Sequence, residues 1–149
     1  MNFTVATPNF QYKRLDNGIF EFVLLNNSRA AADDFFDVIA RFHAAVAAKQ
    51  VHDTQTAFLI ELRQAGMPNV AYMTNRYRAN MALYQQQLPP ARVAYVYTSG
   101  FVFSMVSALL SLAAKQYEFQ QRFFHVSDRE AAEEWLLGRD ATLPHRPTF

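Results

Sequence analysis

The chain has 149 residues, no cysteine and a formal net charge of +1, which suits a single ordinary domain with a substantial core. Near-neutral charge argues against the clustered positive charge that nucleic-acid binding needs. The lack of cysteine excludes disulfides, thiolate zinc sites and a cysteine nucleophile. Because the first residues show no secretory-signal pattern, we expect a cytoplasmic protein.

The first predicted element is a β-hairpin over residues 9–26. Two strand-like runs flank Asn17 and Gly18. Asn-Gly between such runs is a strong hairpin signal, because both residue types tolerate positive φ. The chain is therefore expected to begin with two antiparallel strands.

An amphipathic helix is predicted next, over residues 28–49. Ser28 or Asn27 can cap its start, because a short polar side chain there accepts a hydrogen bond from the first helical turn. Its apolar face repeats at helical spacing and consists of Phe35, Ile39, Phe42 and Val46.

Two apolar strands are predicted in the middle of the chain, at residues 56–62 and 92–97. Both are short and nearly continuous in apolar residues, which is typical of central strands covered on both faces. Between them, one helical face of apolar residues runs from Asn69 until Pro89 and Pro90 end the helix.

Residues 93–114 carry no charge and are long enough to cross a bilayer as one helix. However, Thr98, Ser99 and Gly100 interrupt the run, and the residues before them are β-branched or aromatic. We therefore interpret the run as strand, turn and helix, with the helix over residues 101–116, and expect no transmembrane segment.

The last predicted elements are a strand over residues 123–126 and a short helix. Ser127 and Glu130 have the spacing of a capping box, and Gly138 suits a left-handed helix end. Residues 140–149 are expected to be an irregular tail. The fold class is α/β: an N-terminal hairpin, then alternating strands and helices. These give one mostly parallel mixed sheet of about five strands with about four helices, in one domain over residues 1–149.

This order of elements resembles the STAS fold, and the closing motif Ala131-Ala132-Glu133-Glu134-Trp135-Leu136 resembles the SpoIIAA-like branch of bacterial STAS-like proteins. The resemblance covers residues 10–138 and implies a non-enzymatic regulatory or interaction module. In the founding anti-sigma-factor antagonists, a serine after the third strand is phosphorylated to switch partner binding. The matching loop, residues 63–69, has no serine or threonine, so that switch is not carried over.

Two surfaces are candidates for binding. Polar residues in and after the loop that matches the family's switch loop form the candidate partner site: Gln64, Asn69, Tyr72 and Arg76. The helix over residues 101–116 is apolar nearly all round, so it needs cover on nearly all sides. The candidate interface residues on it are Phe101, Met105, Val106, Leu109 and Leu112.

Three covers for this apolar helix remain open. A second copy or another protein is the first, and we therefore expect a homodimer. The chain itself is the second, through the helix over residues 28–49 or the tail. A lipid-like ligand is the third.

No catalytic constellation, metal site or cofactor is predicted. The four histidines lie far apart without ligand spacing, and an acidic pair such as Asp33 and Asp37 is ordinary at a helix start. The sequence thus favours a non-catalytic module that acts through protein–protein contacts. The alternative is a carrier or sensor of a lipid-like or small apolar ligand.

Overall fold

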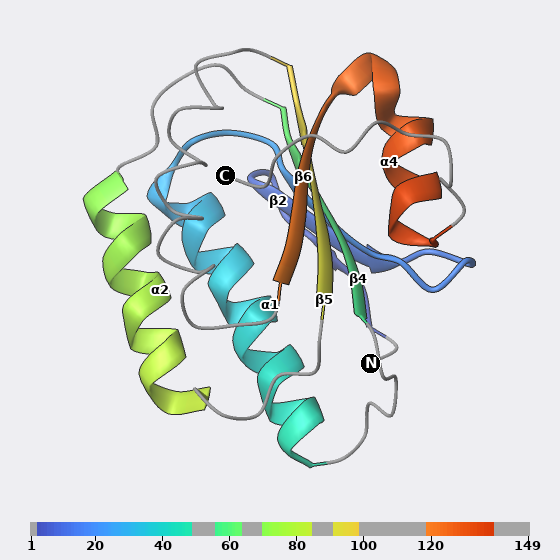
Figure 1. Cartoon of the computed structure of the whole chain (residues 1–149). Coiled ribbons are helices and arrows are strands. Elements are labelled where there is room, and N and C mark those ends of the chain that lie inside the picture. The colour runs from blue at the N-terminus through green and yellow to red at the C-terminus, as the bar shows by residue number, and fades with distance from the viewer. Residues whose placement is uncertain (1–2, 49–55, 64–69, 85–90, 99–118, 139–149) are drawn as a thin grey trace.

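The computed structural model describes residues 3–48, 56–63, 70–84, 91–98 and 119–138. These residues form one six-stranded sheet in which the strands follow one another in chain order (Figure 1). The strands are β1 (Val5–Ala6), β2 (Phe10–Arg14), β3 (Phe20–Leu24), β4 (Thr56–Leu62), β5 (Ala91–Tyr97) and β6 (Phe119–His125).

The sheet is mixed. Strands β1, β2 and β3 pair antiparallel, and β3 to β6 pair parallel. The predicted α/β class, with an N-terminal hairpin before a mostly parallel sheet, is therefore confirmed. The two-residue strand β1 was not predicted.

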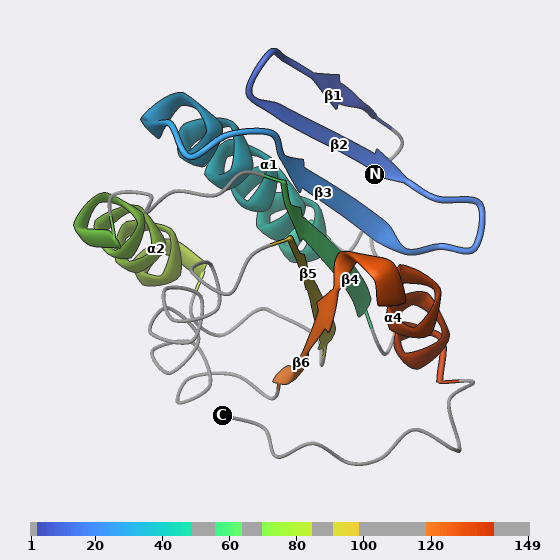
Figure 2. The ribbon, with the colours of Figure 1, turned by 90° about the horizontal axis from the view of Figure 1, so that it is seen from above.

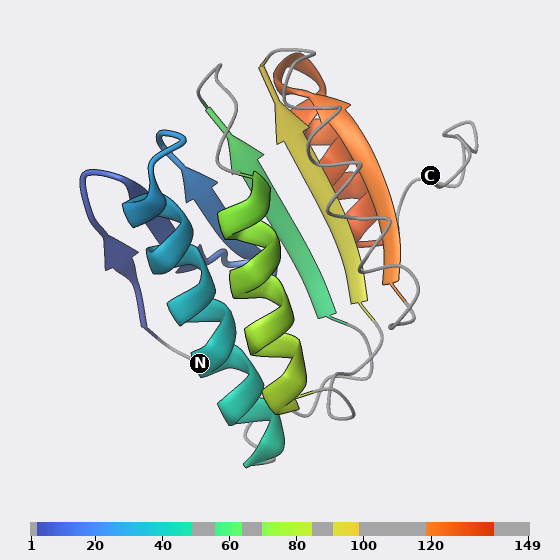
Figure 3. The same cartoon turned by 90° about the vertical axis from the view of Figure 1, so that its left-hand side faces the viewer.

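Helices cover the two faces of the sheet unequally. α1 (Arg29–Ala47) and α2 (Val70–Tyr84) lie side by side on one face, and the short α4 (Arg129–Leu136) lies on the other (Figures 2 and 3). Right-handed crossovers that advance in one direction along a parallel sheet place their helices on the same face. This explains why α1 and α2 share a face.

Helix α1 begins where the sequence predicts. Ser28 is the N-cap, and its Oγ accepts a hydrogen bond from the Ala31 N–H at 3.1 Å. The predicted apolar face packs against the sheet, with Phe42 fully buried and Phe35 partly buried.

The sheet face beneath α1 is built largely from aromatic rings, and we call it the aromatic face. Phe22 is fully buried, and its ring centroid lies 5.0 Å from that of Tyr12 and 5.7 Å from that of Phe58. The Phe42 ring of α1 and the Phe58 ring meet edge to face, with 5.0 Å between their centroids. Its members on strands β2 to β4 are Phe10, Tyr12, Phe20, Phe22 and Phe58.

The opposite face has a smaller apolar core under α4. Leu59, Ala94 and Val96 of the sheet are fully buried there. They pack with Ala132, Trp135 and Leu136 of α4.

The start of α4 corrects the predicted capping box. Asp128 precedes the helix and makes no side-chain capping bond, and residues 126–128 form a 3₁₀ turn. The Ser127 N–H donates to His125 Nδ1 at 3.2 Å, so the histidine caps this turn instead. The predicted helix end is confirmed, because Gly138 has a φ of +71°.

Strand β6 begins at Phe119, earlier than the predicted start at residue 123. The strand half of the uncharged run is confirmed as β5. The helix over residues 101–116 and the tail over residues 140–149 lie outside the described residues. No helix in the described stretches is both long and apolar enough to cross a membrane.

Candidate functional site

Two buried glutamates lie on the α4 side of the sheet. Glu21 on β3 and Glu61 on β4 are each only 5% exposed. Glu21 pairs with Leu59, and Glu61 pairs with Val23. Because side chains alternate along a strand, both carboxylates point to the face that carries Leu59. We call this the charged face.

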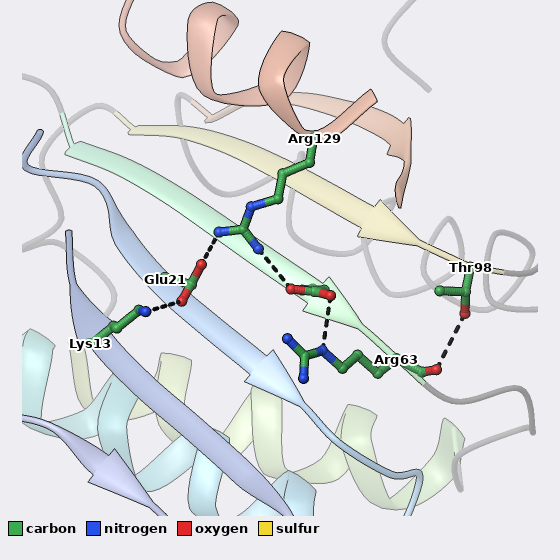
Figure 4. A network of polar contacts seen from close by, with 6 residues as sticks. Lys13, Glu21, Arg63, Thr98 and Arg129 are labelled. Atoms are coloured by element: carbon green, nitrogen blue, oxygen red, sulfur yellow. Dashed lines mark hydrogen bonds and ion pairs between the residues drawn. The ribbon is translucent and has the colours of Figure 1, made fainter. Parts of the chain in front are cut away.

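Arg129, the first residue of α4, bridges the two carboxylates (Figure 4). Its Nη1 donates to Glu61 Oε2 at 2.9 Å, and its Nη2 donates to Glu21 Oε2. Burial lowers the pKa of Arg129, but the hydrogen bond to Glu21 and the charges of nearby glutamates outweigh this effect and raise the pKa above its ordinary value.

Two further cations bind the outer carboxylate oxygens. Lys13 Nζ lies 3.4 Å from Glu21 Oε1, and Arg63 Nε lies 3.0 Å from Glu61 Oε1. Both cations are about half exposed, whereas the carboxylates are buried. The result is an alternating row of charges across β2, β3 and β4 (Figure 4). We call it the charge network; its members are Lys13, Glu21, Arg129, Glu61 and Arg63.

The other end of α4 is held by Arg92 of β5. Its Nη1 donates to the backbone oxygen of Trp135 at 2.8 Å, and a cation is favourable at a helix C-terminus. The guanidinium groups of Arg92 and Arg122 lie 5.6 and 5.7 Å from the centre of the Trp135 ring. Helix α4 is therefore fixed to the sheet by an arginine near each end.

The geometry of the charge network suits the attachment of a helix. Each carboxylate is bound by Arg129 and by one outer cation. Each oxygen of these buried carboxylates has a cation beside it, so the two negative charges are compensated where they are buried. The network therefore ties α4 to two central strands.

A second polar cluster joins α1 to α2, and we call it the α1–α2 seam. The Tyr72 hydroxyl donates to Asp33 Oδ1. Arg76 Nε lies 3.3 Å from the same oxygen, and Arg76 Nη2 lies 3.2 Å from Asp37 Oδ1. The hydrogen bond to Asp33 raises the pKa of Tyr72, with burial adding to the effect.

The seam contains two of the four predicted partner-binding residues. Tyr72 and Arg76 lie one helical turn apart on α2, and the Arg29 guanidinium of α1 lies 5.1 Å from the Tyr72 ring centre. The other two, Gln64 and Asn69, lie outside the described residues. The predicted interface residues also lie outside them: Phe101, Met105, Val106, Leu109 and Leu112.

Some polar groups are buried on the aromatic face. Thr56 is 2% exposed and Gln121 is 8% exposed. Thr56 Oγ1 and Gln121 Nε2 form no hydrogen bond with any described residue. Nearby, the Tyr95 ring stacks on Phe123 at 5.2 Å, and burial, with the neighbouring Tyr77, raises the pKa of Tyr95.

Two further titratable groups are buried, one on α1 and one on β2. His43 of α1 is 4% exposed, and burial lowers its pKa to about 4. Burial raises the pKa of Tyr12 on β2 to about 12, although Arg14 and Arg41 oppose the shift. Both groups are therefore neutral at pH 7.

The sequence interpretation missed the charge network. One residue in the sequence could have indicated it: Glu61 is the only charged residue of the central strand β4. A charge in a strand covered on both faces needs a buried partner. The partner could not be named, because Arg129 is 68 residues away in the chain.

Comparison with known proteins finds no relative: no family model, no curated protein and no solved structure matches this chain. In the described part of the chain, no group of three or more histidine, aspartate or glutamate residues is arranged to hold a metal ion. The two clusters, the charge network and the α1–α2 seam, are therefore interpreted from their own geometry.

Proposed function

We propose that this protein is a non-catalytic interaction module that acts through protein–protein contacts, as the resemblance to STAS-like proteins implies. The proposed module lacks the phospho-acceptor serine of the founding antagonists. The observation that carries this proposal is the α1–α2 seam, which presents a tyrosine and an arginine at the helical surface.

The seam has the chemistry of a binding surface. Tyrosine and arginine are enriched among the residues that dominate protein interfaces. Asp33 and Asp37 hold Tyr72 and Arg76 in place, so less side-chain freedom is lost on binding. The side chains remain accessible: Arg76 is 35% exposed and Asp37 is 72% exposed.

The charge network supports the same proposal. Its carboxylates are bound by cations on both sides, which favours attachment of α4 over proton transfer. A general acid or base needs an oxygen that can reach a substrate. Here the two carboxylates are buried beneath Arg129 and their outer cations.

The proposal includes self-association, and size-exclusion chromatography with light scattering tests it. We expect a dimer at micromolar concentrations. If the seam is the interface, Arg76→Glu should weaken the dimer at least tenfold. If the apolar helix predicted over residues 101–116 is the interface, Leu109→Asp should weaken the dimer to the same extent. Arg78→Glu, at an exposed position of α2, is the matched control. A wild-type monomer would contradict self-association.

A second candidate function is the binding of a small ligand inside the fold. Thr56 Oγ1 and Gln121 Nε2 are buried without a hydrogen-bonding partner among the described residues, and such groups in a folded protein usually bind a water or a ligand. Native mass spectrometry of protein from fresh cells tests this candidate. Added mass on a monomer would favour it, and bare protein mass would count against it.

A further inference from the structure

Helix α4 depends on the sheet for its existence. It has only eight residues, and an isolated helix of that length is not stable in water. It packs on β4, β5 and β6, on the face opposite α1 and α2 (Figure 2). If its attachment weakens, α4 is therefore expected to leave the sheet and to unfold in the same step.

The attachment has an apolar part and a charged part. Ala132, Trp135 and Leu136 supply the apolar part, whose strength does not depend on charge. Arg129 supplies the charged part by bridging Glu21 and Glu61. When a buried ion pair separates, the attraction between its charges is lost but the ions regain hydration. The net free energy of the charged part is therefore a small difference between these two opposing terms.

We propose that α4 is a releasable cover, held on the sheet by the salt bridges from Arg129 to Glu21 and Glu61 and released when both salt bridges are lost. Release uncovers the apolar surface of Leu59, Ala94 and Val96. This inference concerns regulation of the charged face and does not depend on the α1–α2 seam.

The direction of the effect follows from the charges that surround Arg129. In the charge network three cations alternate with two anions. Without the two carboxylate charges, Lys13, Arg63 and Arg129 remain as three positive charges that repel one another. Loss of both carboxylate charges therefore favours release of α4. The other charged groups around α4 are Arg92 on β5 and Arg122 on β6, together with Asp128, Glu130, Glu133 and Glu134 on or next to α4 itself.

The chain carries its own reporter of this motion. Trp135 is the only tryptophan in the chain; it belongs to α4, packs against the sheet and is 7% exposed. Its fluorescence and its quenching by acrylamide therefore report whether α4 covers the sheet. Far-UV circular dichroism reports the rest of the fold in the same sample.

The test uses the full chain at pH 7.5 with the double variant Glu21→Gln/Glu61→Gln, which removes both charges and keeps the side-chain shape. We expect the acrylamide quenching constant of Trp135 to rise at least threefold while the cooperative thermal transition of the fold is retained. Glu130→Gln/Glu134→Gln, which removes two charges from α4 outside the charge network, is the matched control and should quench like the wild type. Wild-type quenching in the Glu21→Gln/Glu61→Gln variant would overturn the proposal.

A double variant that fails to fold is replaced by Arg129→Met, which removes both salt bridges of α4 and is compared with the wild type by hydrogen exchange at pH 7.5. The amides of α4 should then show at least a tenfold larger increase in opening than those of β4. Equal changes in α4 and β4 would overturn the proposal.

Discussion

The two faces of the sheet are buried in different ways. On the aromatic face, rings from β2, β3 and β4 pack against α1, a helix of 19 residues. On the charged face, two glutamates are as buried as the rings but bind three cations. The first face is held by contact area, and the second depends on charge balance.

The difference follows from the topology. Crossover helices that share one face give that face long, continuous cover. On the other face, the eight-residue α4 is the cover among the described elements, and long charged side chains extend the cover beyond it. The aromatic face should therefore set most of the stability, and the charged face should depend more on the balance of charges.

The largest expected effect is at the centre of the aromatic face. Phe22→Ala removes a fully buried ring that contacts Tyr12, Phe35 and Phe58. It should lower the free energy of unfolding by about 4 kcal/mol, because a cavity adds to the lost burial. Urea unfolding measures the loss. Gln11→Ala, at an exposed position of the neighbouring strand, should change the value by less than about 0.5 kcal/mol.

The charged face should respond next. Arg129→Met leaves two buried carboxylates with one exposed cation each, and it should cost about 3 kcal/mol, because breaking a buried pair strands its charges. Urea unfolding at pH 7.5 measures this cost. A loss below about 1 kcal/mol would show that water already solvates the glutamates.

A triple variant sharpens the contrast between the faces. Glu21→Leu/Glu61→Leu/Arg129→Met turns the charge network into an apolar layer like that of the aromatic face. Because desolvation of the ions is removed together with their attraction, stability should stay within about 1 kcal/mol of the wild type or rise. The same unfolding experiment decides between this outcome and a loss as large as that of Arg129→Met.

A smaller effect comes from a histidine packed in the α1 layer. Burial keeps His43 neutral by lowering its pKa from 6.5 to about 4. Its contribution to stability is present above pH 6.5 and is lost as the pH falls toward 4. The loss should reach about 2 kcal/mol by pH 5, because the unfolded chain takes up the proton first. His43→Gln should remove this part of the pH dependence, measured by urea unfolding at several pH values.

The smallest effect is expected at the exposed edge of the α1–α2 seam. Asp37→Asn removes the ion pair with Arg76, in which the side chain of Asp37 is 72% exposed. It should cost about 0.3 kcal/mol in low salt and nothing measurable in 0.5 M NaCl, because exposed pairs are weak and screened. A salt-independent loss above about 1 kcal/mol would mean that Asp37 has a packing role.

Local patterns predicted the fold class and most elements. The apolar spacing of Phe35 to Val46 and the cap at Ser28 predicted α1, and the apolar run from Thr56 to Leu62 predicted β4. These signals work because each depends on neighbouring residues in the chain. The capping box at Ser127 failed because the side chain of His125 took the Ser127 N–H.

The candidate site was much less predictable. Tyr72 and Arg76 were selected from their position near a loop, but their partners Asp33 and Asp37 are 39 residues away. Glu21 and Arg129 are separated by 108 residues. Such pairs are fixed by the register of the sheet and by the placement of α4, and local periodicity carries no information on either.

The order of the strands has a consequence for synthesis on the ribosome. Each strand from β2 to β6 pairs with the strand made just before it, so the sheet can grow from one edge as the chain emerges. Glu21, however, emerges 108 residues before Arg129, which at ordinary elongation rates is roughly 5 to 20 seconds. Throughout that interval the nascent sheet carries Glu21 without the arginine that later bridges it to Glu61. Attachment of α4 is thus expected to be among the last steps of folding.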